Sequence, residues 1–123
     1  MRQVSKATST TLLAAIALYV LAGCGSYPAP TERMTTSQSA VRAAQEVGAP
    51  NNPQAALHLK LAQEQVEQAK QLMTDGENKR AEYVLLRAES DAELAVALAR
   101  ESTARQAAQR ALDEVRSLKN GGQ

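Results

Sequence analysis

The sequence predicts an all-α fold, and three observations support this prediction. The 123 residues are 44% hydrophobic, but with no Trp, no Phe and three Tyr the apolar content is mostly Ala and Leu. Alanine and leucine are strong helix formers, whereas aromatic and β-branched residues are typical of strands. Apolar residues also recur at alternating spacings of four and three, which indicates helices that pack along one stripe. We therefore expect helices separated by Pro- and Gly-containing breaks, and no sheet.

The first element in the chain has the features of a cleaved signal peptide over residues 1–23. Arg2 and Lys6 give it a positive start. Residues 12–22 then form an apolar run of about eleven residues, whereas a membrane-spanning helix needs about twenty. The run ends at Leu21, Ala22, Gly23 and Cys24, which resembles the lipobox of bacterial lipoproteins. This resemblance implies cleavage between Gly23 and Cys24, followed by a diacylglyceryl and an N-acyl chain on Cys24.

The lipobox also carries an expectation about location. Gly25 follows the cysteine, where an Asp typically retains such lipoproteins in the inner membrane. The resemblance therefore implies a lipid-anchored protein on the periplasmic face of the outer membrane. Two or three acyl chains would hold it there, because each buried methylene contributes about 0.8 kcal/mol and a single chain binds only marginally. Membrane lipid is thus its first expected partner.

Residues 24–34 are predicted to be the lipidated N-terminus and a flexible tether, since residues 25–34 contain two prolines and no apolar period. Thr35, with Gln38 three positions later, fits a capping box that opens a helix over residues 36–47. The apolar stripe of this helix consists of Ala40, Ala44 and Val47. Gly48 and Pro50 then end the helix.

The second helix is predicted over residues 53–74, because Asn52 can act as its N-cap and Pro53 suits a first helical position. Its stripe consists of Ala55, Leu59, Ala62, Val66, Ala69 and Met73. Gly76 should close this helix in the left-handed conformation. A third helix is then expected over residues 77–119, followed by a disordered tail at 120–123.

The third helix carries two apolar stripes that differ in phase. The first half repeats the spacing through Ala81, Leu85, Ala88, Ala92, Ala95 and Ala99. After a slip near Arg100 the pattern resumes with Ala104, Ala108, Ala111, Val115 and Leu118. The helical domain as a whole is predicted over residues 35–119.

Two architectures fit these helices. One is a long antiparallel hairpin with one arm broken at Pro50/Pro53, in which the short first helix packs against residues 105–116. The other is a small three-helix bundle. The phase slip, which would lie opposite the Pro50 to Pro53 break, favours the hairpin.

A core built mostly of alanine is thin, because a buried Leu contributes about 1.5–3 kcal/mol and a methyl group much less. We therefore expect the protein to self-associate or to dock on an envelope partner through leucines beside the stripe. This partner face consists of Leu57, Leu61, Leu86, Leu94 and Leu98.

Several classes of function are disfavoured by composition. One Cys and one His cannot build a disulfide framework or a conventional zinc site. Residues 24–123 hold 12 Lys and Arg against 13 Asp and Glu, interspersed at helical spacings such as Arg87 with Asp91, so no basic stripe for nucleic acid is expected. His58 and the carboxylates of Glu89 and Glu93 lack a predicted pocket. We expect no catalytic residues, metal or cofactor, and no enzymatic activity.

The segment from Gly76, Glu77 and Ala81 through residues 86–95, with the sequence LRAESDAELA, resembles the helical domain of unknown function 4398 of small Gram-negative lipoproteins. The resemblance covers most of residues 40–108. It implies an envelope lipoprotein with a helical domain, in some members fused to a peptidoglycan-binding module. We therefore expect a structural or interaction module that acts through an Ala/Leu-rich helical face. The alternative is a non-covalent peptidoglycan-associated or envelope-stress accessory factor.

Overall fold

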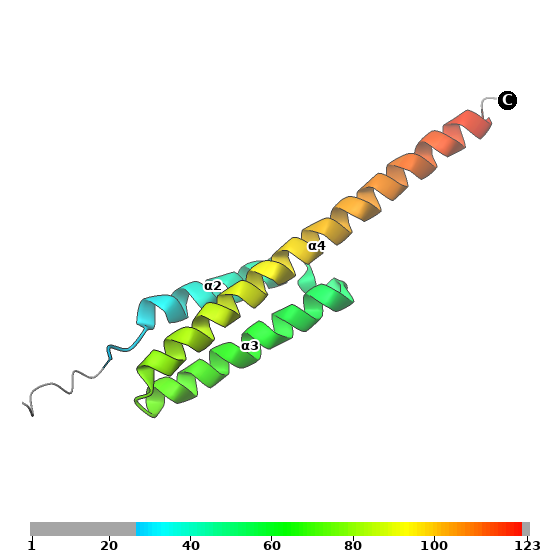
Figure 1. Cartoon of the computed structure of the whole chain (residues 1–123). Coiled ribbons are helices and arrows are strands. Elements are labelled where there is room, and N and C mark those ends of the chain that lie inside the picture. Colours follow the sequence, from blue (N-terminus) through cyan, green and yellow to red (C-terminus); the bar gives the residue numbers. More distant parts are fainter. Residues whose placement is uncertain (1–26, 122–123) are drawn as a thin grey trace, which may run out of the picture.

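The computed structural model describes residues 27–121, which form three α-helices and one short 3₁₀ turn. The helices are α2 (Thr31–Glu46), α3 (Pro53–Thr74) and α4 (Asn78–Gly121), and the turn is η2 (Ala49–Asn51). Helices α2 and α4 run in the same direction and α3 runs against both (Figure 1). The predicted all-α class is confirmed for this part of the chain. The signal peptide, the lipobox and Cys24 lie outside the described residues.

Helix α2 begins at Thr31, five residues before the expected start at residue 36, so residues 31–34 of the expected tether are helical. The predicted capping box is wrong, because the hydroxyl of Thr35 donates to the carbonyl of Thr31 within the same helix. Pro30 occupies the N-cap position, and its carbonyl accepts the first helical bond from Met34. Met34 also packs against buried core residues. The extra turn therefore forms because it adds both backbone bonds and apolar contact.

Helix α3 has the bounds that the sequence predicts, and its N-cap is confirmed. The side chain of Asn52 accepts a hydrogen bond from the amide of Ala55, at 2.9 Å. At the other end Gly76 has a φ of 78°, which is a left-handed conformation that favours glycine. The amide of Glu77 reaches the carbonyl of Leu72, and that of Gly76 reaches Met73. These two bonds form a Schellman motif, which turns the chain back into α4.

The core is a narrow column of small side chains between the three helices. All six predicted stripe residues of the first half of α4, from Ala81 to Ala99, are buried. On α3 the predicted stripe is buried except at its end, where Leu72 is buried and Met73 only partly so. Helix α2 contributes the fully buried Ala44 and Ser37, whereas the predicted Ala40 and Val47 are only partly buried. Alanine at most of these positions lets the helix backbones approach closely.

The described helices form a three-helix bundle, so the expectation that the first helix packs against residues 105–116 is wrong. The segment after α2 reverses the direction of the chain and does not continue it in line. Gly48 has a φ of 83°, and η2 begins at the next residue. Helix α2 therefore folds back beside α3 and packs on the same length of α4. Ala44 and Ala55 consequently share one buried cluster with Ala95 and Ala99.

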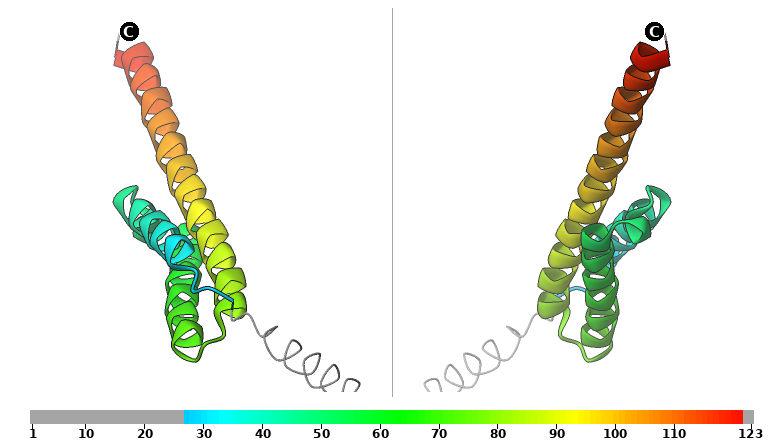
Figure 2. Two further views of the ribbon diagram at one scale, coloured as in Figure 1. Left: turned by 90° about the vertical axis from the view of Figure 1, so that its left-hand side faces the viewer. Right: turned by 90° about the vertical axis from the view of Figure 1, so that its right-hand side faces the viewer.

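Because both shorter helices lie on its first half, the second half of α4 projects alone from the bundle (Figure 2). Every residue from Thr103 to Gly121 is exposed. We call residues 103–121 the free arm, which is about 28 Å long at 1.5 Å per residue. The phase slip near Arg100 marks the place where the bundle ends.

Candidate interaction surface on helix α4

A polar cluster joins α3 to α4 around Asp91. One carboxylate oxygen lies 2.9 Å from Nδ1 of His58, and the other accepts a hydrogen bond from Nε2 of Gln65, also at 2.9 Å. His58 and Asp91 are each about three quarters buried. The sequence pattern places Asp91 on a solvated face beside Arg87, but the carboxylate contacts α3 instead. This cluster fixes the register of two helices.

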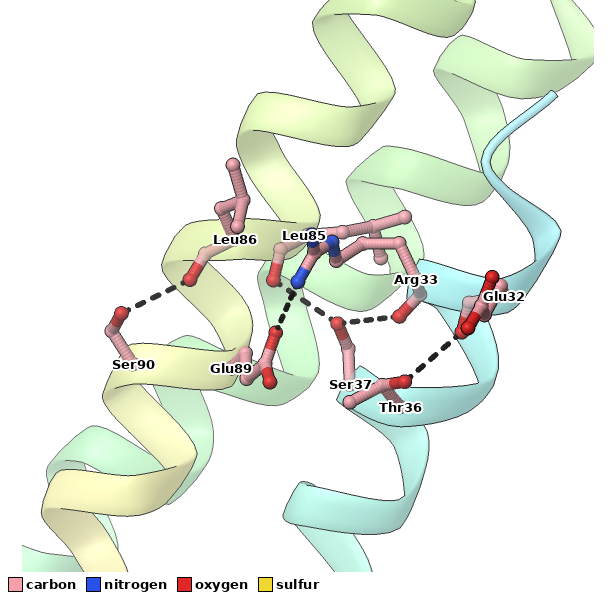
Figure 3. Close-up of polar contacts among 8 residues, drawn as sticks. All are labelled: Glu32, Arg33, Thr36, Ser37, Leu85, Leu86, Glu89 and Ser90. Carbon is pink, nitrogen blue, oxygen red and sulfur yellow. Dashed lines mark hydrogen bonds and ion pairs between the residues drawn. The ribbon is translucent and has the colours of Figure 1, made fainter. Parts of the chain in front are cut away.

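A second polar network joins α2 to α4 (Figure 3). The guanidinium of Arg33 donates to the carboxylate of Glu89 across 3.0 Å. The fully buried hydroxyl of Ser37 lies 3.0 Å from the backbone carbonyl of Leu85 and 2.9 Å from that of Arg33. Glu89 is therefore paired with a cation, whereas Glu93 is exposed. The two carboxylates do not form a paired acid–base site.

Two hollows on the described surface are partly open to solvent. One of about 530 Å³ lies between α2 and α3, where Val41 and Val66 are surrounded by charged and amide side chains. Another, of about 420 Å³, is bordered by residues 27–33 at the start of α2 and by Glu82. Within residues 27–121 no group of three or more His, Cys, Asp or Glu is arranged to hold a metal ion.

The five leucines of the predicted partner face do not share one environment. Leu57, Leu86 and Leu94 are exposed, with exposed fractions of 56%, 38% and 42%. Leu61 and Leu98 are partly buried, and Leu98 packs against the core. Leu86 and Leu94 border a hollow of about 320 Å³ that also includes Ser90 and Asp91.

Helix α4 carries six exposed large apolar side chains, and all six lie on one side of the helix. An α-helix turns by about 100° per residue, so each position can be placed relative to the buried Ala99. On this wheel the six residues occupy a sector of about 120° that faces away from the buried stripe. We call this sector the outer stripe; it consists of Tyr83, Leu86, Leu94, Leu112, Val115 and Leu118.

The sequence analysis missed the outer stripe because it continued the packed stripe of α4 through Val115 and Leu118. The five-residue step from Ala99 to Ala104 rotates the pattern by about 140°. The apolar residues of the free arm therefore face away from α2 and α3. Leu112, Val115 and Leu118 are 58%, 64% and 70% exposed. The phase slip was visible in the sequence, and its angle already predicts the change of face.

Comparison with known protein families identifies the family of this chain. The family model described as Domain of unknown function (DUF4398) matches residues 32–111, which is more than half of the chain. The chain belongs to the DUF4398 family. The match includes the whole three-helix bundle except Thr31, and it ends at Ala111, inside the free arm.

Two further comparisons identify no similar protein. The searches of curated proteins and of solved structures found no match. No helix within residues 27–121 is long and apolar enough to cross a bilayer.

Proposed function

We propose that this DUF4398 protein is a lipid-anchored interaction module of the bacterial envelope that presents an apolar face of α4 to another envelope component. The observation that carries the proposal is the outer stripe. Its side chains occur along α4 from Tyr83 to Leu118, and each is more than a third exposed in the described chain. Exposed apolar side chains that gather on one side of a helix are typical of a protein interaction site.

The anchor is proposed from the lipobox-like residues Leu21 to Cys24. Acylation of Cys24 would hold the chain at the periplasmic face of the outer membrane. The first described residue, Tyr27, lies against the start of α4, because its backbone carbonyl accepts a hydrogen bond from the side chain of Asn78. Helix α4 has 44 residues and is therefore about 66 Å long. An anchor at Cys24 would thus be near one end of α4, and the free arm would be at the other.

The anchoring half of the proposal is tested with Cys24→Ala in the full chain, expressed in a Gram-negative bacterium. The native chain should fractionate with the outer membrane and incorporate radiolabelled palmitate. The variant should lose the label and leave the membrane fraction. Retention of Cys24→Ala in the outer membrane would contradict lipid anchoring.

The interaction half is tested by placing a photoreactive amino acid at position 86 or 94 of the full chain in cells. Gln45, which is exposed on α2, provides the matched control position. Adducts from positions 86 and 94, but not from 45, support docking through the outer stripe. A chain that forms no adduct from either position, yet co-purifies with isolated sacculi, would contradict this role and favour peptidoglycan association.

A further inference from the structure

The free arm carries the apolar pattern of a coiled coil, which is a structure formed by pairing with another helix. Its apolar residues follow the heptad spacing of a coiled coil, with Ala108 and Val115 at the a positions and Ala104, Ala111 and Leu118 at the d positions. In parallel coiled coils, a β-branched residue at a with leucine at d favours two strands. Val115 followed by Leu118 has this arrangement. Both are more than half exposed in the single chain.

We infer that the free arm pairs in parallel with the free arm of a second copy of this chain. This inference rests on the proposed function and deepens it by naming a partner for the part of the outer stripe that lies on the free arm. The pairing face points away from α2 and α3, as the rotation after Ala99 requires, so a second helix can lie along the arm without meeting the bundle. The two bundles would then sit on opposite outer sides of the pair.

The charges beside the pairing face favour the parallel orientation. In a parallel pair, a residue at g faces the residue five positions later, at e, on the other helix. This places Glu114 opposite Lys119 of the second copy, which is an attractive pair, and Arg105 opposite Arg100 just before the arm, which is a repulsive one. An antiparallel pair centred on the same apolar residues would place Lys119 opposite Arg105 and Glu114 opposite Glu114. Like charges would then meet on both sides of the pair, and no attractive pair would offset them.

Geometry also favours a second copy over the anchoring membrane as the occupant. Tyr27 is held at the start of α4 by Asn78, whereas the free arm forms the opposite end of the same helix. The arm is therefore directed away from the end of the chain where the anchor is proposed. Two chains anchored in one leaflet would point their arms in the same direction, and their confinement would raise the effective concentration of each arm for the other.

The test uses the full chain in cells, with a photoreactive amino acid at position 115 and, as the matched control, at position 117. Ser117 is exposed on the polar side of the same arm, where its hydroxyl bonds to the carbonyl of Glu114. Two copies with different tags identify a self-adduct. We expect a self-adduct from position 115 and none from position 117. An adduct only with lipid or another protein, or no adduct, would overturn the inference.

Charge exchange tests the orientation. In the parallel pair, Lys119→Glu places two carboxylates opposite each other and should reduce the yield of self-adduct from position 115 severalfold. The double variant Glu114→Lys/Lys119→Glu should restore it. In an antiparallel pair Lys119→Glu would face Arg105 and increase the yield, which would overturn the parallel arrangement.

The pairing of the arms and the lipid anchor can be tested independently of each other. The dissociation constant of the pair can be measured without a membrane, on the purified full chain in mild detergent. Val115→Glu should raise this dissociation constant at least about tenfold relative to Ser117→Glu. Equal constants for the two variants would overturn the pairing. Loss of outer-membrane fractionation with intact pairing in detergent would instead overturn only the lipid anchor.

Discussion

The hydroxyl of Ser37 on α2 donates a hydrogen bond to the backbone carbonyl of Leu85 on α4, with 3.0 Å between the two oxygens. A side chain reaches the backbone of a neighbouring helix at this distance only if the helices are close together. Ser37 is fully buried, and a serine is small enough to fit this contact. The contact therefore distinguishes the three-helix bundle from a hairpin in which α2 packs further along α4.

Replacement of Ser37 should destabilise the bundle, either because the hydrogen bond is lost or because the new side chain is too large for the contact. We expect Ser37→Ala to cost about 1 kcal/mol, the usual net contribution of a hydrogen bond. Ser37→Leu should cost about 1–3 kcal/mol, because an oversized side chain forces α2 away from α4. Urea unfolding measures both, with Ser39→Leu on the exposed side of α2 as the control. Equal stability of the two leucine variants would show that α2 does not pack here.

The helices and the buried stripes of α3 and α4 were predictable because each depends on local information. The stripe from Ala81 to Ala99 follows from apolar periodicity, and the start of α3 follows from Asn52 and Pro53. The place where α2 packs was not predictable in the same way. It depends on the direction that the chain takes after Gly48, and a Gly–Ala–Pro sequence is compatible with both a kink and a reversal.

The polar contacts of the candidate surface were the least predictable features. The sequence places Asp91 four residues after Arg87 on one helix face, but His58 and Gln65 compete for its carboxylate from α3. Only the register between helices decides this competition. The outer stripe was partly predictable: Leu86 and Leu94 were assigned to the partner face and are exposed, whereas Val115 and Leu118 were assigned to a packed stripe that the structure does not have.

The buried alanines between the helices should not tolerate replacement by larger side chains. Ala92 is fully buried between the helices, so Ala92→Leu should lower the free energy of unfolding by about 1–3 kcal/mol through overpacking. Ala97 is exposed on the same helix, and Ala97→Leu should change the free energy by less than about 0.5 kcal/mol. Urea unfolding of both variants checks the difference. A neutral or stabilising effect of Ala92→Leu would contradict the close approach of the helices.

Loss of the Asp91 carboxylate should weaken the contact between α3 and α4. Asp91→Ala removes the partner of both His58 and Gln65, and the buried Oε1 of Gln65 already lacks a protein partner. We expect a cost of about 1–3 kcal/mol, because buried polar atoms are left without hydrogen bonds. Glu93→Ala, which removes an exposed carboxylate from the same helix, is the control. Equal thermal stability of the two variants would assign Asp91 to the solvated surface.

The pKa of the Tyr27 phenol can be used to test whether Tyr27 contacts α4 in solution. Its hydroxyl donates a hydrogen bond to the carboxylate of Glu82, which raises the pKa of the phenol above its ordinary value of 10.0. The contact therefore stabilises the fold below about pH 10 and is lost as the pH rises through the raised pKa. Glu82→Gln should lower the pKa of Tyr27 towards its ordinary value.

Near-ultraviolet absorbance of the phenolate measures this titration, and Tyr27→Phe identifies which transition belongs to Tyr27. The Glu82→Gln variant removes the charge while it keeps an oxygen that can accept a hydrogen bond. An unchanged pKa of Tyr27 in Glu82→Gln would show that the hydroxyl of Tyr27 does not bond to Glu82.

Removal of the free arm should leave the bundle intact, because every residue from Thr103 to Gly121 is exposed and the buried stripe ends at Ala99. A chain that stops after Thr103 should lose the helical circular dichroism of the arm, yet at low protein concentration its bundle should unfold within about 0.5 kcal/mol of the full chain. In the full chain, pairing of the arms adds a contribution to stability that grows with protein concentration. The shortened chain should lack this concentration dependence. A large loss of stability at low concentration would instead show that the arm folds back onto the bundle.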